Sequence, residues 1–122
     1  IIDMEIKKTG KLFSFCCMAP LIVKKKNIKE IKIFERIGSD VGLLFQITDD
    51  LIDHDVSSKM AGKKTKKDEK QGKATLISLL GYKNTIKYKD KIKSKIIRVL
   101  KKYGKNSKNI NETLNYILTR NK

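Results

Sequence analysis

Three aspartates, Asp49, Asp50 and Asp53, are the residues of this sequence whose types and spacing point most directly to chemistry. They form the pattern DDxxD within residues 45–53, an apolar segment of helical periodicity. Residues four apart share a helix face, so Asp49 and Asp53 lie one turn apart, and Asp50 lies about 100° round from Asp49. Such carboxylates repel one another unless a cation lies between them, and oxygen ligands without Cys or His suit Mg²⁺ with a bound phosphate. The alternative is a solvated edge of an amphipathic helix.

Polar residues that fit the same chemistry occur before and within this segment. Lys8-Thr9-Gly10 supplies an ammonium group, a hydroxyl group and a residue that lets a ligand approach. Gln46 precedes Asp50 by four residues, so its amide is expected on the same helix face as the acids.

Two further lysines follow glycines later in the chain. Lys63 lies in a lysine-rich stretch without helical pattern, and Lys73 precedes an apolar helical segment. A helix N-terminus attracts anions, so Lys73 is well placed to meet a phosphate. Magnesium held by carboxylates, together with such lysines, would neutralise a departing pyrophosphate, and stabilising charge that develops in this way is usually the largest catalytic contribution.

The elements that must position these residues are all predicted to be helices. Apolar residues recur at intervals of three and four, and no segment shows the alternation of a strand. Gly38 and Gly42 are expected to permit close approach of another helix or a ligand, and Pro20 to kink the first helix or end its regular part. The predicted helices cover residues 3–23, 28–54, 73–81 and 84–103, and residues 55–72 form a loop.

Two smaller expectations concern the ends and the packing of these helices. Gly104 is expected to cap the helix over residues 84–103, and Asn109 to cap a final helix with Glu112 at its third position. Phe13 and Phe15 are expected to pack inward.

Length and charge define the broad class. The 122 residues suit a single domain or a piece of one, and 29 Lys+Arg against 13 Asp+Glu give a formal charge of +16. This charge supports an alternative function, a lysine-rich binder of nucleic acid or anionic surfaces. Only Arg36, Arg98 and Arg120 are arginines, and no zinc site or aromatic stacking platform accompanies the charge. The clustered aspartates would repel a nucleic acid, so this function is the second choice.

The cysteines and the hydropathy of the sequence indicate the cellular compartment in which the protein is expected. Cys16 and Cys17 are adjacent and cannot join distant segments, which favours a reducing, cytoplasmic compartment. Residues 12–23 form an apolar run that is too short to span a bilayer, so no stable membrane insertion is expected. The chain begins with Ile1 and not Met, which suggests that upstream sequence precedes it.

The order of these motifs resembles a known family. KTG, then GLLFQITDDLID, then GK, then GKAT, with TRNK at the end, is similar to the C-terminal half of trans-prenyl diphosphate synthases, especially the bacterial farnesyl diphosphate synthases. The resemblance covers residues 6–122. It implies an all-α helical bundle of the isoprenoid (terpenoid) synthase type, here a single domain over residues 1–122 with the N-terminal helices missing.

The resemblance implies a magnesium-dependent prenyltransferase of isoprenoid biosynthesis, homodimeric at full length, that joins an allylic diphosphate to isopentenyl diphosphate. The metal ligands would be Asp49, Asp50 and Asp53, with Asp49 a direct ligand. Lys8 and Lys63 would clasp the allylic diphosphate. Lys73 would lie near the metal-bound diphosphate. Thr9 and Gln46 would stabilise cationic charge and assist proton loss.

The sequence also departs from the family pattern. Leu76 and Ile77 follow the GKAT element where the family commonly has a proline, and Pro20 is unusual in the first helix. The first aspartate-rich motif of the family is absent, so the isolated chain is expected not to catalyse prenyl transfer. A degenerate or purely structural fragment is the third reading, which the intact DDxxD, KTG and GK elements oppose. The terminal residues 120–122 resemble a basic tail that folds toward the active site.

Overall fold

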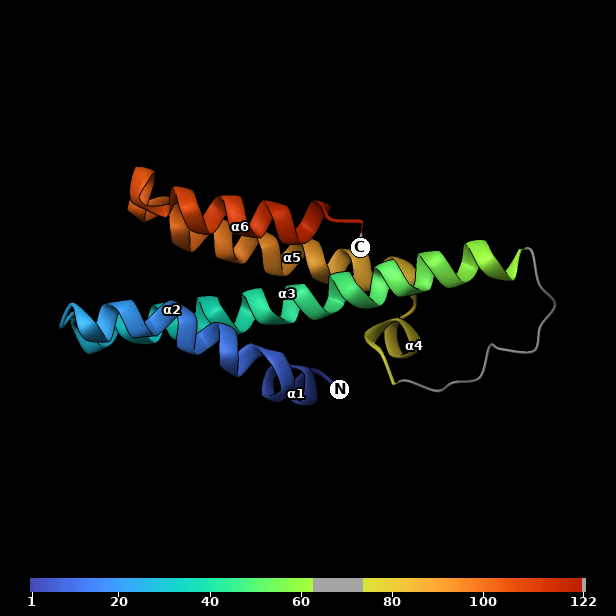
Figure 1. Cartoon of the computed structure of the whole chain (residues 1–122), viewed down its shortest axis with the longest axis horizontal. Coiled ribbons are helices and arrows are strands. Elements are labelled where there is room, and N and C mark those ends of the chain that lie inside the picture. The colour runs from blue at the N-terminus through green and yellow to red at the C-terminus, as the bar shows by residue number, and fades with distance from the viewer. Residues whose placement is uncertain (63–73, 122) are drawn as a thin grey trace.

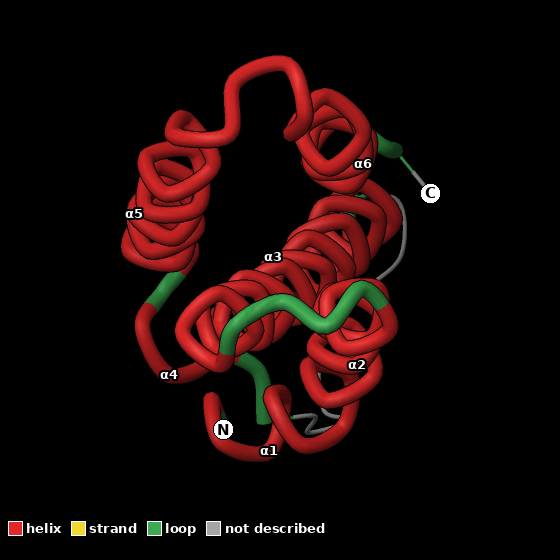
Figure 2. The backbone as a smooth tube through the Cα atoms, turned by 90° about the vertical axis from the view of Figure 1, so that its left-hand side faces the viewer, coloured by secondary structure: helices red, strands yellow, loops and turns green. Residues whose placement is uncertain are grey.

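One long helix, α3 (Ile28–Ala61), is the element against which the other α-helices pack. The structure is a computed structural model that describes residues 1–62 and 74–121. Figure 1 shows α3 running through the molecule, with α5 and α6 along one side and α2 along another. Seen end-on in Figure 2, these three helices surround α3. The described part of the chain contains helices and no strand, which confirms the all-α prediction.

The described elements follow one another in a simple order. A short α1 leads through a π-helical turn, η1, into α2, which forms an antiparallel hairpin with α3. A short α4 then precedes α5, a 3₁₀ segment η2 and the last helix. The bounds are α1 (Ile2–Glu5), η1 (Ile6–Gly10), α2 (Lys11–Val23), α4 (Leu76–Leu80), α5 (Tyr82–Leu100), η2 (Lys101–Ser107) and α6 (Lys108–Thr119).

Local sequence explains the turn between α2 and α3. Pro20 lies in the last turn of α2, and the helix continues to Val23, although a proline cannot donate the helical hydrogen bond to the carbonyl oxygen four residues earlier. Lys25 then adopts a positive φ of 53° in the turn. Asn27 caps α3, since its side chain accepts a hydrogen bond of 2.9 Å from the backbone N–H of Glu30.

Glycine is required where α2 and α3 cross. A Cβ atom on Gly38 would lie 2.5 Å from the carbonyl oxygen of Phe13, and one on Gly42 would lie 2.6 Å from the Cα of Gly10. Both glycines therefore serve close approach of another helix, one of the two roles expected of them. The crossing at Gly42 brings η1, the segment that contains Lys8 and Thr9, against the middle of α3.

The core lies where α3, α4, α5 and α6 meet, and it is built from the periodic apolar positions. Leu44 and Ile47 on α3 have no exposed surface, and Leu76, Ile96, Leu100 and Leu114 are almost as deeply buried. Asp40 on α3 and Lys95 on α5 add an ion pair of 2.7 Å at the edge of this core. None of the described helices is both long enough and apolar enough to cross a membrane.

Several boundaries differ from the sequence prediction. α4 begins at Leu76 and ends at Leu80, inside the predicted range 73–81, and α5 begins at Tyr82, two residues before the predicted start. α3 continues through residue 61, although a loop was predicted from residue 55. No proline interrupts this stretch, and its polar side chains are exposed, so helical hydrogen bonding continues without a packed face. α5 ends at Leu100 and is followed by η2, in which Gly104 has φ 52°, so this glycine lies in the turn and does not directly cap α5.

A further difference concerns the last helix. Its N-cap is Ser107, and Asn109 lies inside the helix, so the predicted Asn109–Glu112 cap was wrong. The Ser107 hydroxyl donates to the carbonyl oxygen of Gly104 at 2.7 Å, which joins the preceding turn directly to α6. A capping box does occur at α4, where Thr75 and Ser78 exchange backbone-to-side-chain hydrogen bonds of 3.1 and 3.2 Å.

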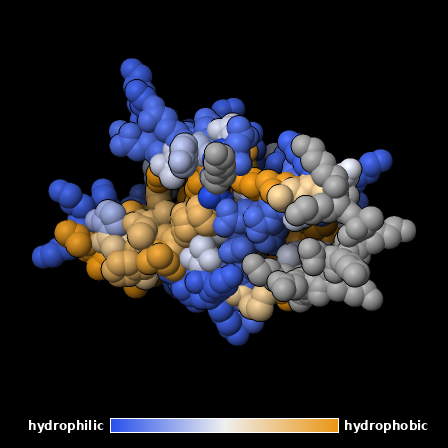
Figure 3. All heavy atoms as spheres, turned by 45° about the vertical axis from the view of Figure 1, so that its right-hand side comes forward, coloured by the Kyte–Doolittle hydropathy of each residue, from blue (hydrophilic) through white to orange (hydrophobic). Residues whose placement is uncertain are grey.

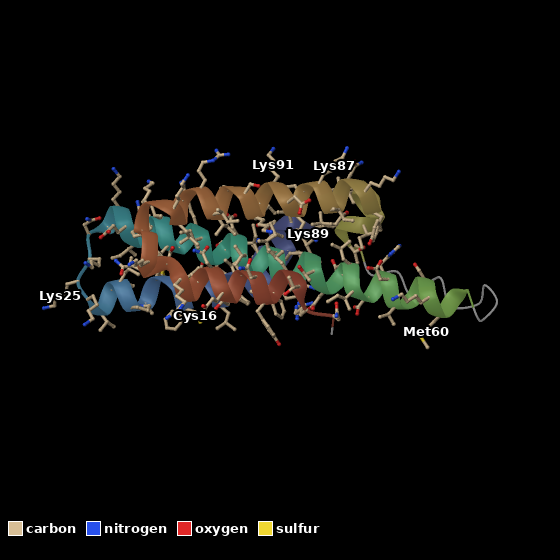
Figure 4. The ribbon with its side chains drawn as sticks, turned by 90° about the horizontal axis from the view of Figure 1, so that it is seen from above. Cys16, Lys25, Met60, Lys87, Lys89 and Lys91 are labelled. Atoms are coloured by element: carbon tan, nitrogen blue, oxygen red, sulfur yellow. The ribbon has the colours of Figure 1, made fainter. Side chains whose placement is uncertain are left out.

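The surface carries both apolar and lysine-rich areas. Figure 3 shows apolar side chains gathered on one flank of the molecule, and on α2 the side chains of Leu12, Phe15 and Val23 are more than half exposed. Phe15 was expected to pack inward, and this was wrong, whereas Phe13 packs against Phe45. The lysines are spread over the helices, and Figure 4 shows Lys87 and Lys91 projecting outward from α5.

Candidate active site

The predicted catalytic side chains lie where η1 meets α3. The hydroxyl of Thr9 donates a hydrogen bond of 3.4 Å to Oε1 of Gln46, and Nε2 of Gln46 donates one of 3.5 Å to Oδ1 of Asp50. Thr9 and Gln46 are 37 positions apart in the sequence, so only the crossing of the two segments joins them. The amide of Gln46 is thereby oriented between a hydroxyl group and a carboxylate.

The π-helical turn gives Lys8 and Thr9 their position. A π turn adds a residue to a regular helix and is often found at functional sites. Here η1 covers residues 6–10, and its last residue is Gly10, whose Cα lies against Gly42 of α3. The KTG motif is therefore presented by an irregular helical turn, which the helical periodicity of the sequence did not predict.

The three aspartates lie on adjoining turns of α3 at different depths. Asp49 and Asp50 are partly buried, and Asp53 is exposed. Burial raises the pKa of Asp50, which the nearby charges of Asp53 and Asp49 raise further. The hydrogen bond from Gln46 and the ammonium group of Lys8 oppose this rise. The hydrogen bond from Gln46 and the charge of Lys8 thus do not fully offset the effects of burial and of the neighbouring acids on the Asp50 carboxylate.

Arg120, immediately after α6, reaches the acidic edge of α3, which is formed by Asp49, Asp50 and Asp53, from the other end of the chain. Its Nη2 donates to Oδ1 of Asp49 at 2.5 Å and to the carbonyl oxygen of Phe45 at 3.2 Å. Its guanidinium carbon lies 4.0 Å from the centre of the Phe45 ring, within range of a cation–π interaction. The Arg120 side chain is only 12% exposed. The guanidinium therefore compensates the charge of Asp49.

Glu5, at the end of α1, is a residue of this region that the sequence reading missed. Its side chain is 5% exposed, and its Oε2 has no hydrogen-bond partner among the described residues. Asp50 raises the pKa of Glu5 and Lys8 lowers it, although burial is the largest influence. In the sequence, Glu5 lies between the charged residues Asp3 and Lys7, so nothing there marked it as buried.

His54 and Tyr82 form a small polar cluster beside the acidic segment. The Tyr82 hydroxyl donates to Oδ2 of Asp55 at 3.4 Å, and the rings of His54 and Tyr82 lie 5.0 Å apart. The hydrogen bond to Asp55 raises the pKa of Tyr82. These contacts join the end of α3 to the start of α5 and involve surface side chains.

The structure brings together five of the eight predicted site residues: Lys8, Thr9, Gln46, Asp49 and Asp50. Asp53 lies one turn further along α3, and Lys63 and Lys73 fall outside the described residues. Within residues 1–62 and 74–121, no three His, Cys, Asp or Glu side chains are already grouped as metal ligands. The donor set nevertheless fits Mg²⁺, because it consists of carboxylate oxygens with an amide and a hydroxyl group beside them.

Comparisons with known proteins identify the family of the chain. Residues 2–117 match the family model described as polyprenyl synthetase. The chain is 31% identical to a farnesyl diphosphate synthase of Micrococcus luteus, over 98% of this chain and 41% of that protein. It is also 35% identical to a farnesyl diphosphate synthase of Bacillus subtilis, over 61% of this chain and 25% of that one.

A plant relative gives the same picture. The chain is 30% identical to geranylgeranyl pyrophosphate synthase 4 of Arabidopsis thaliana, over 74% of this chain and 24% of that protein. It thus spans at most 41% of the length of these relatives. No solved structure matches. The helical fold and the family match over nearly the whole chain together show that this chain belongs to the polyprenyl synthetase family.

Proposed function

We propose that the chain supplies one side of the active site of a magnesium-dependent prenyltransferase. The substrates would be an allylic diphosphate and isopentenyl diphosphate, and the products a trans-prenyl diphosphate such as farnesyl diphosphate, and pyrophosphate. The observation that carries the proposal is the hydrogen-bonded series from Thr9 through Gln46 to Asp50, with Lys8 close enough to influence Asp50. The family and the names of its members support the reaction type.

Each residue has a role that its chemistry permits. The carboxylates of Asp49, Asp50 and Asp53 would hold Mg²⁺, which supplies the positive charge that makes pyrophosphate a good leaving group. Lys8 would contact the allylic diphosphate as a point charge, and Lys63 and Lys73, which lie outside the described residues, would contact further phosphate oxygens. These assignments come from the motif order and remain proposals.

Thr9 and Gln46 would act on the carbon skeleton. Ionisation of an allylic diphosphate leaves a carbocation, and the uncharged oxygens of a hydroxyl and an amide stabilise such a cation by their dipoles without acting as strong nucleophiles. The Thr9–Gln46 hydrogen bond keeps these two groups together. The same pair would assist removal of the proton after the new carbon–carbon bond has formed.

The Asp49–Arg120 ion pair must change during this function. Oδ1 of Asp49 accepts a hydrogen bond from the guanidinium group of Arg120, so that oxygen is occupied before a metal ion binds. Release of Arg120 would free the carboxylate for Mg²⁺ and a guanidinium group for an anionic ligand. We further propose that the complete protein is a homodimer and acts in the cytoplasm.

The test is calorimetric titration of the 122-residue chain with pyrophosphate, with and without Mg²⁺. We expect pyrophosphate to bind only when Mg²⁺ is present. Asp49→Asn should weaken this binding by about tenfold or more, as is usual when a metal ligand or its close neighbours are altered. Asp90→Asn on the exposed face of α5 is the matched control. Equal affinity of the two variants would refute the metal assignment.

A second titration addresses the nucleic-acid alternative. Binding of the chain to duplex DNA should be weak and fall steeply with salt, as expected of nonspecific lysine contacts. Magnesium-dependent pyrophosphate binding should depend on Lys8, and Lys8→Ala is compared with Lys91→Ala, which removes an exposed α5 lysine (Figure 4). Tight DNA binding at physiological salt, together with no effect of Lys8→Ala, would favour the alternative.

A further inference from the structure

Glu5 is a buried acid that the proposed chemistry does not use. The side chain is 5% exposed, and the buried Oε2 has no hydrogen-bond partner within the described residues. A buried carboxylate oxygen without a partner destabilises a protein, because the water it loses on folding is not replaced. An orphaned group of this kind in a folded protein calls for an explanation such as a bound ion or water.

The charges around Glu5 belong to the candidate active site. Asp50 on α3 raises the pKa of Glu5, and the Lys8 ammonium and the Ile1 amino group lower it. The same ammonium lowers the pKa of Asp50. Glu5 and Asp50 are therefore within electrostatic reach of each other and of Lys8. Glu5 also directly precedes the π-helical turn that carries Lys8 and Thr9, and α1 contacts α3.

We propose that Glu5 is a fourth carboxylate of the cation site and acts on it from α1. This inference rests on the proposed function, since Asp49, Asp50 and Asp53 would hold the metal ion. A divalent cation at Asp50 would compensate the charge of Glu5 and, through a metal-bound water or directly, give the buried oxygen its missing partner. Glu5 would then add to the negative potential that attracts the metal.

A purely structural Glu5 leads to a different expectation. Glu5→Gln removes an uncompensated buried charge and keeps the shape of the side chain, so the metal-free variant should be at least as stable as the parent chain. If Glu5 served packing alone, this substitution would leave metal binding unchanged. If Glu5 belongs to the cation site, the same variant should lose metal affinity while its stability is kept.

The experiment measures Mn²⁺ binding to the 122-residue chain by electron paramagnetic resonance, with Mn²⁺ in place of Mg²⁺. We expect Glu5→Gln to weaken binding by about tenfold, the lower end of the range for residues that support metal ligands. Glu112→Gln is the matched control, because it removes the same charge from an exposed position of α6. Thermal unfolding of both metal-free variants shows that they fold.

The outcomes separate this inference from the proposed function. Equal Mn²⁺ affinities of Glu5→Gln and Glu112→Gln, with weaker binding by Asp49→Asn, would overturn the role of Glu5 alone. No effect of Asp49→Asn would overturn the proposed metal site and this inference with it. If Glu5→Gln does not fold, Glu5→Asp keeps the charge and is expected to bind Mn²⁺ within about threefold of the parent chain, well short of the loss for a removed charge. A tenfold loss in this charged variant would count against the inference.

Discussion

At the scale of single residues, the acidic edge of α3 is only partly compensated. Arg120 pairs with Asp49, Gln46 donates to Asp50, and Lys8 influences Asp50 from η1. A carboxylate whose pKa is raised by burial and by neighbouring acids, as for Asp50, is commonly found at functional sites. The acidic edge is therefore compensated by side chains from η1, from α3 itself and from the residue after α6.

Removal of Arg120 should strengthen metal binding. Arg120→Ala frees Oδ1 of Asp49 from a competing guanidinium group, and we expect Mn²⁺ affinity to rise by about tenfold, equivalent to ~1.4 kcal/mol. Arg98→Ala, on the exposed face of α5, removes the same charge as a control. Paramagnetic resonance titration measures both variants, and an unchanged or lower affinity for Arg120→Ala would contradict the competition.

Asp50 should make stability depend on pH. Its folded-state pKa is raised, chiefly by burial, so its ionisation disfavours the folded state at neutral pH. We expect Asp50→Asn to be more stable than the parent chain at pH 7 in the absence of metal. The difference should shrink as pH falls through the raised pKa and vanish below the usual value of 3.8.

Urea unfolding at a series of pH values measures this effect. Asp90→Asn serves as the control, since Asp90 lies on the exposed side of α5. A gain in stability for Asp50→Asn that persists unchanged at low pH would show that its cause is not the ionisation of Asp50.

At the scale of elements, the site depends on how closely η1 and α2 approach α3. The backbone contact at Gly42 places η1 against α3 and allows Thr9 to reach Gln46. Side-chain packing extends this contact, since the ring centres of Phe13 and Phe45 lie 5.5 Å apart and the Arg120 guanidinium lies over the Phe45 ring. A small separation of these elements would therefore break the hydrogen bonds of the site first.

A methyl group at the crossing should have this effect. Gly42→Ala places a Cβ 2.6 Å from the Cα of Gly10, and because both contacting groups are backbone we expect a loss of about 1–3 kcal/mol of unfolding free energy. Gly62→Ala is the control: its Cβ meets nothing closer than 3.6 Å, and its helical φ suits alanine.

The control variant should be neutral or slightly stabilising, by up to about 1 kcal/mol. Urea unfolding measures both variants. Because Gly42→Ala separates Thr9 from Gln46, it should also weaken magnesium-dependent pyrophosphate binding, which Gly62→Ala should leave unchanged.

At the scale of the whole molecule, the described helices form one bundle around α3, with the acidic edge near the C-terminal end of the chain. The chain spans 41% of the length of its Micrococcus luteus relative, and within its described residues no three His, Cys, Asp or Glu side chains are grouped so that they could hold a metal ion. The outer face of α2 is apolar and exposed, with Phe15 59% and Val23 78% accessible.

We therefore expect the isolated 122-residue chain to bind pyrophosphate with Mg²⁺ but not to join prenyl units. Ionisation of an allylic diphosphate requires charge stabilisation around the whole leaving group, and α3 supplies carboxylates from one side. Incubation with radiolabelled isopentenyl diphosphate and an allylic diphosphate, followed by extraction of prenyl products, measures this. Detectable farnesyl diphosphate above the Asp49→Asn background would contradict the expectation.

The sequence by itself determined the all-α fold, the helical segments and the family. These properties follow from local periodicity and from motif order, which can both be read from the sequence. For example, the apolar spacing of Leu44, Ile47 and Leu51 marks the buried face of α3. Helix ends were predicted less well, as the extension of α3 and the Ser107 cap show, because exposed helix ends depend on small local energies.

Only the tertiary structure decided which distant groups meet. The Thr9–Gln46 hydrogen bond joins residues 37 apart, and the Asp49–Arg120 ion pair joins residues 71 apart. The burial of Glu5 likewise depends on how α1 rests on α3, which no local pattern encodes. The sequence specified the acids of the site, whereas helix packing decided which hydroxyl, amide and guanidinium groups compensate them, because such contacts arise from the close approach of segments that are independent in the unfolded chain.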